Sequence, residues 1–202
     1  MTSRSAEHSR ELAERLGAAW AQAELTEEAA VDAAVGAAVE RFGRIDGLFS
    51  VAGGSGRRFG DGPIHTVTAD AWEATVALNL RTQVLVAAAV TRQMLAQAPN
   101  DSGTRGSILL MGSVTTSDPS PELFATHGYA AAKGALTALM TTMAATYAPH
   151  GIRVNIVAPS LTRTPMAQRA ATDPAILAYA RRKQPLAGEM LCLLYTSDAA
   201  DD

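Results

Sequence analysis

Residues 107–158 read SILLMGSVTTSDPSPELFATHGYAAAKGALTALMTTMAATYAPHGIRVNIVA. Two short apolar runs in this stretch, Ser107–Met111 and Ile152–Ala158, are continuous in the way that strands buried on both faces are. The alanine-rich segment Gly128–Ala148 between them has the length of a helix, and Pro149-His150-Gly151 ends it. A strand, a crossover helix and a second strand in this order predict a parallel pair in an α/β sheet.

The same alternation continues toward both ends of the sequence. Thr26 is expected to cap one of the further helices, Glu27–Phe42. The pattern predicts a doubly wound α/β domain over residues 1–190, with a parallel sheet covered by helices on both faces. The other expected elements are helices over Ser5–Leu16, Asp70–Gln97 and Pro165–Lys183, and strands over Ala18–Glu24 and Ile45–Ala52.

Composition excludes several classes of protein. The 202 residues carry 17 basic and 20 acidic side chains, which offers no electrostatic basis for binding nucleic acid or an anionic membrane. The single cysteine, Cys192, excludes a disulfide framework. No continuous apolar run reaches the ~18–20 residues that span a bilayer. The first residues lack a secretory signal, so we expect a cytoplasmic protein. We assign no metal ligands.

Polar side chains follow the predicted strands. Ser113 comes after Ser107–Met111, and Tyr129-x-x-x-Lys133 opens the helix Gly128–Ala148. A spacing of four residues puts the phenol and the ammonium on one helix face. A nearby cation lowers the pKa of a phenol, about 10 when free, toward the range that acid–base catalysis requires. Tyrosine–lysine pairs at this spacing are common, so this pair alone favours an ordinary helix face.

Two further features reverse that assessment. Asn79 lies among apolar residues of Asp70–Gln97, where burial of an amide requires partners; a satisfied core asparagine is the alternative reading. The segment beginning at Pro159 leaves the strand Ile152–Ala158 at the same edge of the sheet. The ordered set Asn79, Ser113, Tyr129-x-x-x-Lys133 and Pro159…Thr164 resembles the signature of the short-chain dehydrogenase/reductase family, and the resemblance runs through most of the sequence.

The resemblance implies an NAD(P)-dependent oxidoreductase that interconverts a carbonyl and an alcohol of a small molecule by hydride transfer. Tyr129 would be the general acid in reduction and the base in oxidation. Lys133 would lower the pKa of Tyr129 and hydrogen-bond the nicotinamide ribose. Ser113 would orient the substrate oxygen, and Asn79 would hold a water that connects Lys133 to solvent.

The resemblance also implies where the cofactor, NADP or NAD, would lie. Thr164 would contact the nicotinamide carboxamide. Arg4, which follows Ser3 at an expected strand end, would meet a 2′-phosphate and favours NADP, although a frayed terminus explains these residues equally well. Residues 50–53 read Ser-Val-Ala-Gly where the family commonly has Asn-Asn-Ala-Gly. The remaining cofactor residues implied are Pro159, Ser160 and Thr162 beside Thr164, Glu24 and Leu25 at the adenine, and Ala52 and Gly53 at the adenosine ribose.

The glycine-rich segment Gly54–Gly60 resembles a phosphate-binding loop. The dinucleotide fingerprint requires a helix that begins directly after the glycine loop. Asp61-Gly62-Pro63 follows this segment and prevents such a helix. We therefore expect Gly53–Gly62 to be a mobile loop on the substrate side. Arg57 and Arg58 in this loop either meet an anionic group of the substrate or are solvated.

The two ends depart from the family pattern. No glycine fingerprint precedes the helix Ser5–Leu16, so the first strand, its turn and the first helix are expected upstream of Met1. Residues 191–202 resemble a translated adapter tail, with a disordered acidic tail as the alternative. We expect a fragment that lacks the first βα unit and the last helix and strand, folds poorly and is inactive.

The resemblance also implies an oligomer. When complete, the protein would be a homodimer or homotetramer that pairs through the helices Asp70–Gln97 and Gly128–Ala148.

The alternative function is that of a non-catalytic, Rossmann-like nucleotide-binding or scaffold protein. Such a protein would be distinguished by loss of the serine, tyrosine or lysine, and Ser113, Tyr129 and Lys133 are all present.

Overall fold

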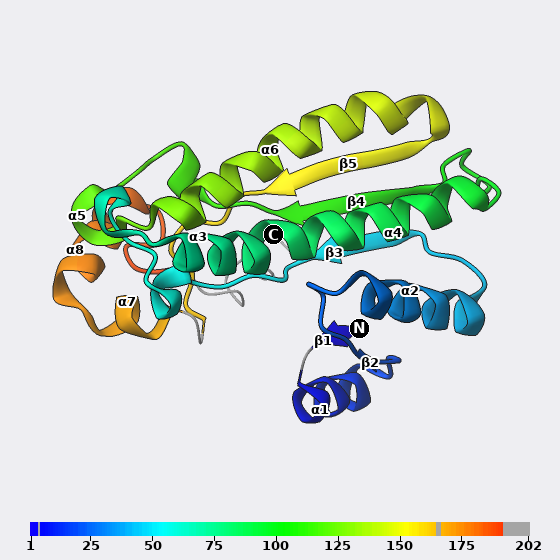
Figure 1. The fold of residues 1–202 in the computed structure, drawn as a ribbon, viewed down its shortest axis with the longest axis horizontal. Helices are drawn as coiled ribbons and strands as arrows, with labels where there is room; N and C mark the ends of the chain where they lie inside the picture. The colour runs from blue at the N-terminus through cyan, green and yellow to red at the C-terminus, as the bar shows by residue number, and fades with distance from the viewer. Residues whose placement is uncertain (4, 165–166, 192–202) are drawn as a thin grey trace.

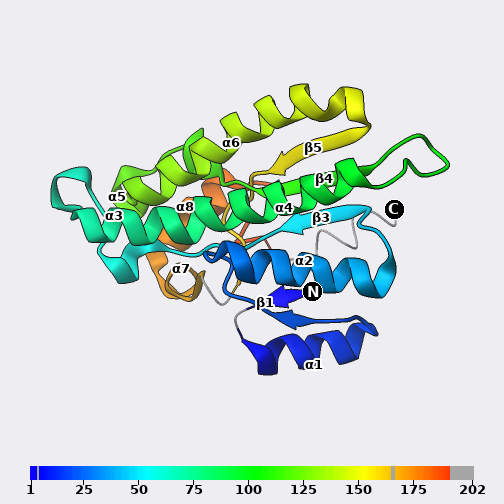
Figure 2. The same cartoon turned by 45° about the vertical axis from the view of Figure 1, so that its right-hand side comes forward.

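The computed structural model describes residues 1–3, 5–164 and 167–191, and their strands form two parallel sheets (Figure 1). One sheet pairs β1 with β2, and the other has the order β3-β4-β5. In Figure 1 and Figure 2, β1 and β2 lie beyond the β3 edge of the larger sheet. Within the described residues, no strand pairing joins the two sheets. The strands are β1 Thr2–Ser3, β2 Ala21–Gln22, β3 Gly47–Ser50, β4 Gly106–Met111 and β5 Ile152–Val157.

Helices alternate with these strands, which confirms the predicted parallel α/β fold. A turn of π-helix, η3 (Ala77–Arg81), interrupts the long helix between β3 and β4. The α-helices are α1 Ala6–Leu16, α2 Glu28–Phe42, α3 Ala69–Val76, α4 Thr82–Ala96, α5 Pro121–Phe124, α6 His127–Tyr147, α7 Gln168–Thr172 and α8 Pro174–Lys183. Short 3₁₀ turns are η1 Gly56–Phe59, η2 Ile64–Thr66, η4 Val114–Thr116 and η5 Ala148–His150.

The main core lies between the larger sheet and the helices α4 and α6. Ile108 and Leu110 of the central strand are fully buried, together with Met94 of α4 and Leu136 of α6. Because side chains two residues apart on a strand share a face, Ile108 and Leu110 both point toward these helices. The carboxyl ends of β3, β4 and β5 point toward the end of the molecule where α5, α7 and α8 lie (Figure 1).

The opposite face of the larger sheet differs from the prediction. Phe49, Leu109 and Asn155 are in register across the three strands, and Phe49 is 58% exposed. Asn155 and its neighbour Arg153 on the same face of β5 are also exposed. Within the described residues this sheet is therefore covered by helices on one face, and α1 instead accompanies the β1–β2 pair.

Several element boundaries also differ. The expected strand Ala18–Glu24 shortens to β2, since β1 is its single partner and offers two residues to pair with. Thr26 does not cap α2; its hydroxyl donates to Glu24 Oε1 at 2.9 Å, and Glu27 occupies the N-cap position. The expected helix Pro165–Lys183 is divided, because Asp173 accepts hydrogen bonds from the first backbone N–H groups of α8.

One long helix, Ala69–Ala96, is apolar overall. By length and composition this π-interrupted helix could cross a membrane, but charged residues break its sequence, so the prediction of no continuous membrane-spanning apolar run is not contradicted. In the fold it is a core helix, because Ala87, Val90 and Met94 pack into the main core.

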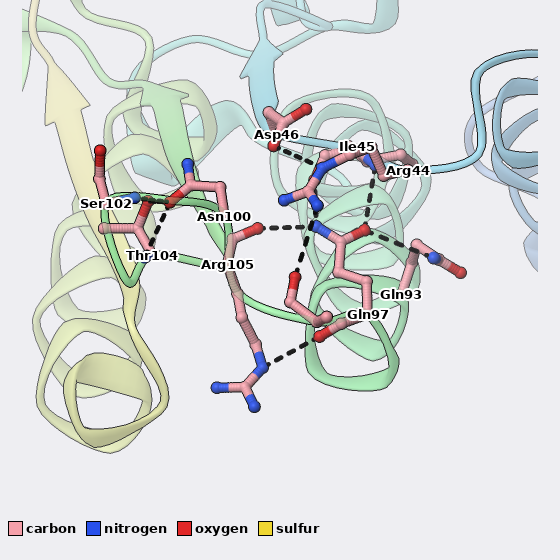
Figure 3. A network of polar contacts seen from close by, with 10 residues as sticks. Arg44, Ile45, Asp46, Gln93, Gln97, Asn100, Ser102, Thr104 and Arg105 are labelled. Carbon is pink, nitrogen blue, oxygen red and sulfur yellow. Dashed lines mark hydrogen bonds and ion pairs between the residues drawn. The ribbon is translucent and has the colours of Figure 1, made fainter.

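Two glutamines from this helical segment tie β3 to β4 at opposite ends of the strands. Gln97, directly after α4, donates from Nε2 to the carbonyl oxygens of Ile45 and Arg105, each at 2.7 Å (Figure 3). The Arg105 guanidinium returns a hydrogen bond to the Gln97 carbonyl at 3.1 Å (Figure 3). Gln83, near the start of α4, bonds Ala52 and Met111 at the carboxyl ends. The strand ends that carry the predicted functional residues are thereby fixed to α4.

Candidate active site

Asn79, Ser113, Tyr129 and Lys133 meet at the carboxyl ends of the larger sheet. Tyr129 lies in the first turn of α6, and its phenol interacts with the side chain of Ser113. Lys133 Nζ lies 5.7 Å from the centroid of the Tyr129 ring. A Cβ atom placed on Gly53 would lie 2.8 Å from Asn79 Oδ1 and 3.4 Å from Lys133 Nζ. The fold therefore assembles one cluster from four segments that are distant in sequence.

Two opposing effects act on the pKa of Tyr129. Burial raises the pKa of the phenol because the phenolate would lose hydration, and the hydrogen bond with Ser113 lowers it by a smaller amount. The lowering of this pKa by Lys133 remains a prediction, and the ammonium lies 5.7 Å from the centroid of the phenol ring.

Lys133 is almost fully buried, at 2% exposure. Its ammonium donates a 2.8 Å hydrogen bond to the carbonyl oxygen of Met111, the last residue of β4. Burial lowers the pKa of Lys133 to about 8, because the cation loses hydration that one acceptor does not replace. An ammonium has three donors, and Met111 O is the acceptor found among the described residues. Lys133 thus retains hydrogen-bonding capacity beside Tyr129.

Asn79 is fully buried within the π turn η3, a local geometry that is frequent at functional sites. Its Nδ2 donates to Gly54 O at 2.9 Å and to Thr75 O at 3.0 Å, and its Oδ1 accepts from Gly54 N at 3.0 Å. All of these partners are protein groups, so Asn79 also fits the alternative reading of a core asparagine whose hydrogen bonds are satisfied. Its proposed part in holding a water remains a prediction.

Ser113 is held by the turn that follows β4. Its Oγ accepts hydrogen bonds from the backbone N–H of Thr115 at 3.3 Å and from the Thr115 hydroxyl at 2.9 Å. With both bonds accepted from Thr115, the Ser113 hydroxyl proton is free to be donated to a further acceptor. Thr115, which sequence reasoning did not select, thereby fixes the serine.

Sequence reasoning also missed Gln83. It is fully buried, and its Nε2 donates to Met111 O at 3.1 Å and, more weakly, to Ala52 O at 3.4 Å. It shares the Met111 carbonyl with Lys133. The available signal was a polar residue within an apolar helix, the same signal that identified Asn79 four residues earlier.

The segment after β5 lies beside the Ser113 turn, where the expected nicotinamide wall would be. Val114 N donates to Pro159 O at 3.1 Å, which joins the two strand-end segments directly. Thr162 donates to Ser160 O at 3.2 Å, and Thr164 O accepts from Ala167 N at 2.9 Å. Pro159, Ser160, Thr162 and Thr164 are all partly buried.

The expected adenine side is less closely tied to this cluster. Glu24 is exposed and Leu25 partly buried in the loop between β2 and α2. Arg81 of the π turn connects this loop to the site by donating to Thr26 O at 2.9 Å. Arg4, expected at a 2′-phosphate, lies outside the described residues, as does Cys192.

The loop Gly53–Gly62, expected to be mobile, makes several hydrogen bonds with the rest of the fold. Both backbone polar groups of Gly54 are bonded to Asn79, and Gly56–Phe59 form the 3₁₀ turn η1 rather than a phosphate-binding helix. The Arg57 guanidinium donates to Leu123 O at 3.2 Å, whereas that of Arg58 lies 4.5 Å from the Phe59 ring centroid. The loop is anchored on both sides by hydrogen bonds.

Across the described ranges, no group of three or more histidine, cysteine, aspartate or glutamate side chains could hold a metal ion. The chemical groups of the site are instead a phenol, a hydroxyl, an amine and an amide.

Comparisons with known proteins bear on the family and the fold of this chain. A family model described as enoyl-(acyl carrier protein) reductase matches residues 1–191. The chain is 34% identical over 174 residues to a Xanthobacter autotrophicus protein named inactive 2-(S)-hydroxypropyl-CoM dehydrogenase 2, covering 84% of this chain and 70% of the relative. It is also 34% identical over 149 residues to levodione reductase from Leifsonia aquatica, covering 72% of this chain and half of that enzyme.

Solved structures show the same fold. The chain is similar to a gluconate 5-dehydrogenase from Burkholderia cenocepacia, solved with NADP and tartrate, at a TM-score of 0.80 and 30% identity, covering 95% of this chain and 72% of that one. A short-chain type dehydrogenase/reductase from Mycobacterium ulcerans has a TM-score of 0.83 at 22% identity, covering 98% of this chain and 70% of that one, and supports the fold alone.

Proposed function

This chain belongs to the short-chain dehydrogenase/reductase family, and we propose on that basis that it carries the proton-transfer site of an NAD(P)-dependent oxidoreductase. The reaction would interconvert a carbonyl and an alcohol of a small molecule. The observation that carries the proposal is geometric: Lys133 Nζ lies 5.7 Å from the Tyr129 ring and is bonded to Met111 O at the end of β4, at the strand edge where α/β sheets bind ligands.

Tyr129 is proposed as the general acid in the reductive direction and the base in the oxidative direction. Burial raises the pKa of Tyr129, so its phenol holds its proton at neutral pH; proton exchange with substrate requires a lower pKa, which the charge of Lys133, 5.7 Å from the ring, would favour. A substrate oxygen placed between the Ser113 and Tyr129 hydroxyls would be oriented for that transfer.

A nicotinamide cofactor would supply the hydride, and the residues here fit the ribose end of such a cofactor. Lys133 is buried and has donors beyond the one that Met111 accepts, as hydrogen bonding to a ribose hydroxyl requires. Gly53 lies beside it, and the absence of a side chain there lets Asn79 Oδ1 and Lys133 Nζ pack close to the strand end. NADP is favoured over NAD by the NADP-bound gluconate 5-dehydrogenase and by Arg4 in the sequence.

The alternative, a non-catalytic nucleotide-binding or scaffold protein, is favoured by one observation. The β1–β2 pair is not joined to β3-β4-β5 by strand pairing within the described residues, so the adenine and nicotinamide sides are held together by the packing of α2 on α4 and by loop contacts such as Arg81–Thr26. The relative named inactive in Xanthobacter autotrophicus is consistent with this alternative.

One experiment separates the two functions. The purified protein is titrated with NADPH and NADH by fluorescence, and turnover is then followed at 340 nm over a panel of aldehydes, ketones and alcohols. The proposed function predicts both saturable binding and turnover of at least one substrate. Binding without any turnover supports the alternative, and the absence of both contradicts the cofactor assignment.

We propose a homodimer or homotetramer formed through α4 and α6, in a cytoplasmic protein. A groove between these helices is apolar, and Val84 and Leu95 on α4 are each more than a third exposed although they belong to the long core helix. Light scattering after size-exclusion chromatography tests this proposal. The wild-type protein should have the mass of a dimer or tetramer, and Leu95→Arg should reduce it to that of a monomer. A monomeric wild-type protein would contradict the proposal. The groove residues include Val84, Ala88, Leu95, Leu139 and Met143.

A further inference from the structure

Asp61, in the loop that follows β3, is 5% exposed and has both carboxylate oxygens bonded to the start of α6. Oδ1 accepts from Gly128 N at 2.8 Å, and Oδ2 accepts from Tyr129 N at 2.9 Å. A buried carboxylate is costly unless it is fully hydrogen-bonded, and hydrogen bonds to a charged acceptor are about twice as strong as neutral ones. Asp61 is thus bonded directly to the backbone of the proposed acid–base residue.

The helix has no comparable cap of its own. Thr126 occupies the N-cap position of α6, but its side chain makes no capping hydrogen bond, and the first turn contains no acidic residue. Asp61 therefore supplies, from 67 and 68 residues away, the two acceptors that the first N–H groups need. Its charge also interacts favourably with the positive end of the helix dipole.

The surrounding packing admits little displacement of this carboxylate. A Cβ atom on Gly128 would lie 3.1 Å from Asp61 Oδ1, and one on Gly56 would lie 2.7 Å from Asp61 Cβ. Both glycines also face the buried side chain of Thr75 on α3, which contacts η1 and α6. Small residues on two elements thus let the loop, α3 and α6 approach closely around Asp61.

Two further hydrogen bonds join the same loop to the same helix end. His127 N donates to Gly62 O at 3.2 Å, and Ile64 N donates to His127 Nδ1 at 3.0 Å. The segment from Asp61 to Ile64 and the first turn of α6 therefore form one hydrogen-bonded unit. Within that unit Asp61 contributes the charged contacts.

We infer that Asp61 is a positioning residue, which sets the place of the Tyr129 phenol relative to Ser113 by clamping the first turn of α6 to the loop after β3. The inference rests on the proposed acid–base role of Tyr129. Proton transfer is sensitive to misplacement of about 1 Å, which can cost about 100-fold in rate. Loss of the clamp should therefore lower kcat while leaving cofactor binding, which involves other groups, nearly unchanged.

The test compares Asp61→Ala and Asp61→Asn with the matched control Asp32→Asn. Asp32 is exposed on α2, where it forms an ion pair with Arg92 at 2.7 Å away from the site. We expect kcat to fall about 10- to 100-fold in Asp61→Ala, with a smaller fall in Asp61→Asn because its amide keeps one acceptor oxygen. The KM for the cofactor should change less than about two-fold, and Asp32→Asn should leave both constants unchanged.

A double variant asks whether Asp61 acts through Tyr129. In the Tyr129→Phe background, Asp61→Asn should cause no further loss of residual turnover, because the group that it positions is already absent. Equal loss in both backgrounds would overturn the inference, as would wild-type kcat in Asp61→Ala.

Hydrogen exchange gives a readout that does not depend on turnover. The amides of residues 127–130 should exchange about ten-fold faster in Asp61→Asn than in wild type and Asp32→Asn, at matched melting temperature. Unchanged exchange there overturns the clamp even if the protein proves inactive. Conversely, if exchange is faster in Asp61→Asn but Tyr129→Phe keeps full turnover, the clamp is supported and the proposed function is refuted.

Discussion

Gln83 bonds both backbone groups of Met111: its Oε1 accepts from Met111 N at 3.0 Å, and its Nε2 donates to Met111 O at 3.1 Å. The same carbonyl accepts from Lys133 Nζ at 2.8 Å. The end of β4 is therefore held by a side chain from α4 and one from α6. Because Lys133 is bonded to Met111, the position of its ammonium depends on the position of that strand end.

Replacement of Gln83 tests this arrangement. Gln83→Met conserves most of the volume but removes the hydrogen bonds to a buried strand end, so we expect the free energy of unfolding to fall by about 1–3 kcal/mol. Denaturant unfolding followed by circular dichroism measures the change. Gln93→Met is the matched control on α4, since Gln93 makes one long contact of 3.4 Å to Gln97, and it should cost under about 0.5 kcal/mol. Equal losses in the two variants would contradict the assignment.

The burial of Lys133 predicts a dependence of stability on pH. Its folded pKa of about 8 lies below the ordinary value of 10.5, so between these values the unfolded chain binds more protons than the folded one. Stability should therefore rise as pH increases from about 8 toward 10, by at most about 3 kcal/mol. The pKa of Tyr129 is raised instead, so its contribution opposes this trend above pH 10.

Chemical denaturation at pH 7.5, 8.5 and 9.5 measures the rise, and Lys133→Met provides the reference. Because methionine does not titrate, the variant should lack the increase that wild type shows. A parallel pH dependence in the two proteins would show that Lys133 is not its source.

A glycine substitution at Gly56 tests the packing around Asp61, and one at Gly36 is the control; they should change the free energy of unfolding in opposite directions. Gly56→Ala would bring a methyl group to 2.6 Å from Thr75 Cγ2 and 2.7 Å from Asp61 Cβ, and overpacking of this kind costs about 1–3 kcal/mol. Gly36→Ala, within α2, meets no atom within 4 Å and should stabilise the helix by up to about 1 kcal/mol. Melting temperatures should move in opposite directions; destabilisation by both would indicate that the space at Gly36 is filled.

The sequence predicted features whose causes are local. The strand–helix–strand unit of residues 107–158 follows from continuous apolar runs and a helical segment between them, and Tyr129 and Lys133 follow from four-residue spacing on that helix. Asp61 was not predicted, because its partners are backbone groups 67 and 68 residues away, and backbone groups leave no mark in a sequence. Gln83 could have been selected as a polar residue in an apolar helix, but its partner could not be predicted, because Met111, 28 residues away, is bonded through its backbone.

The differences in the fold have the same origin. Composition indicated a strand over Ala18–Glu24, but the length of a strand depends on its neighbour, and β1 pairs with two residues of it. Sequence pattern likewise predicted that both faces of the sheet would be covered. Coverage depends on which helices pack there, and Phe49 on the uncovered face of the larger sheet remains 58% exposed.

The most direct measurement of the central claim is the turnover of Tyr129→Phe in the purified protein, with NADPH binding measured on the same sample. Loss of the phenol oxygen removes the proposed acid–base group and leaves the ring, so turnover should fall at least about 100-fold while the Kd for cofactor changes less than about three-fold. Tyr147→Phe, at the far end of α6, is the matched control and should retain wild-type turnover. Wild-type turnover in Tyr129→Phe would contradict the account.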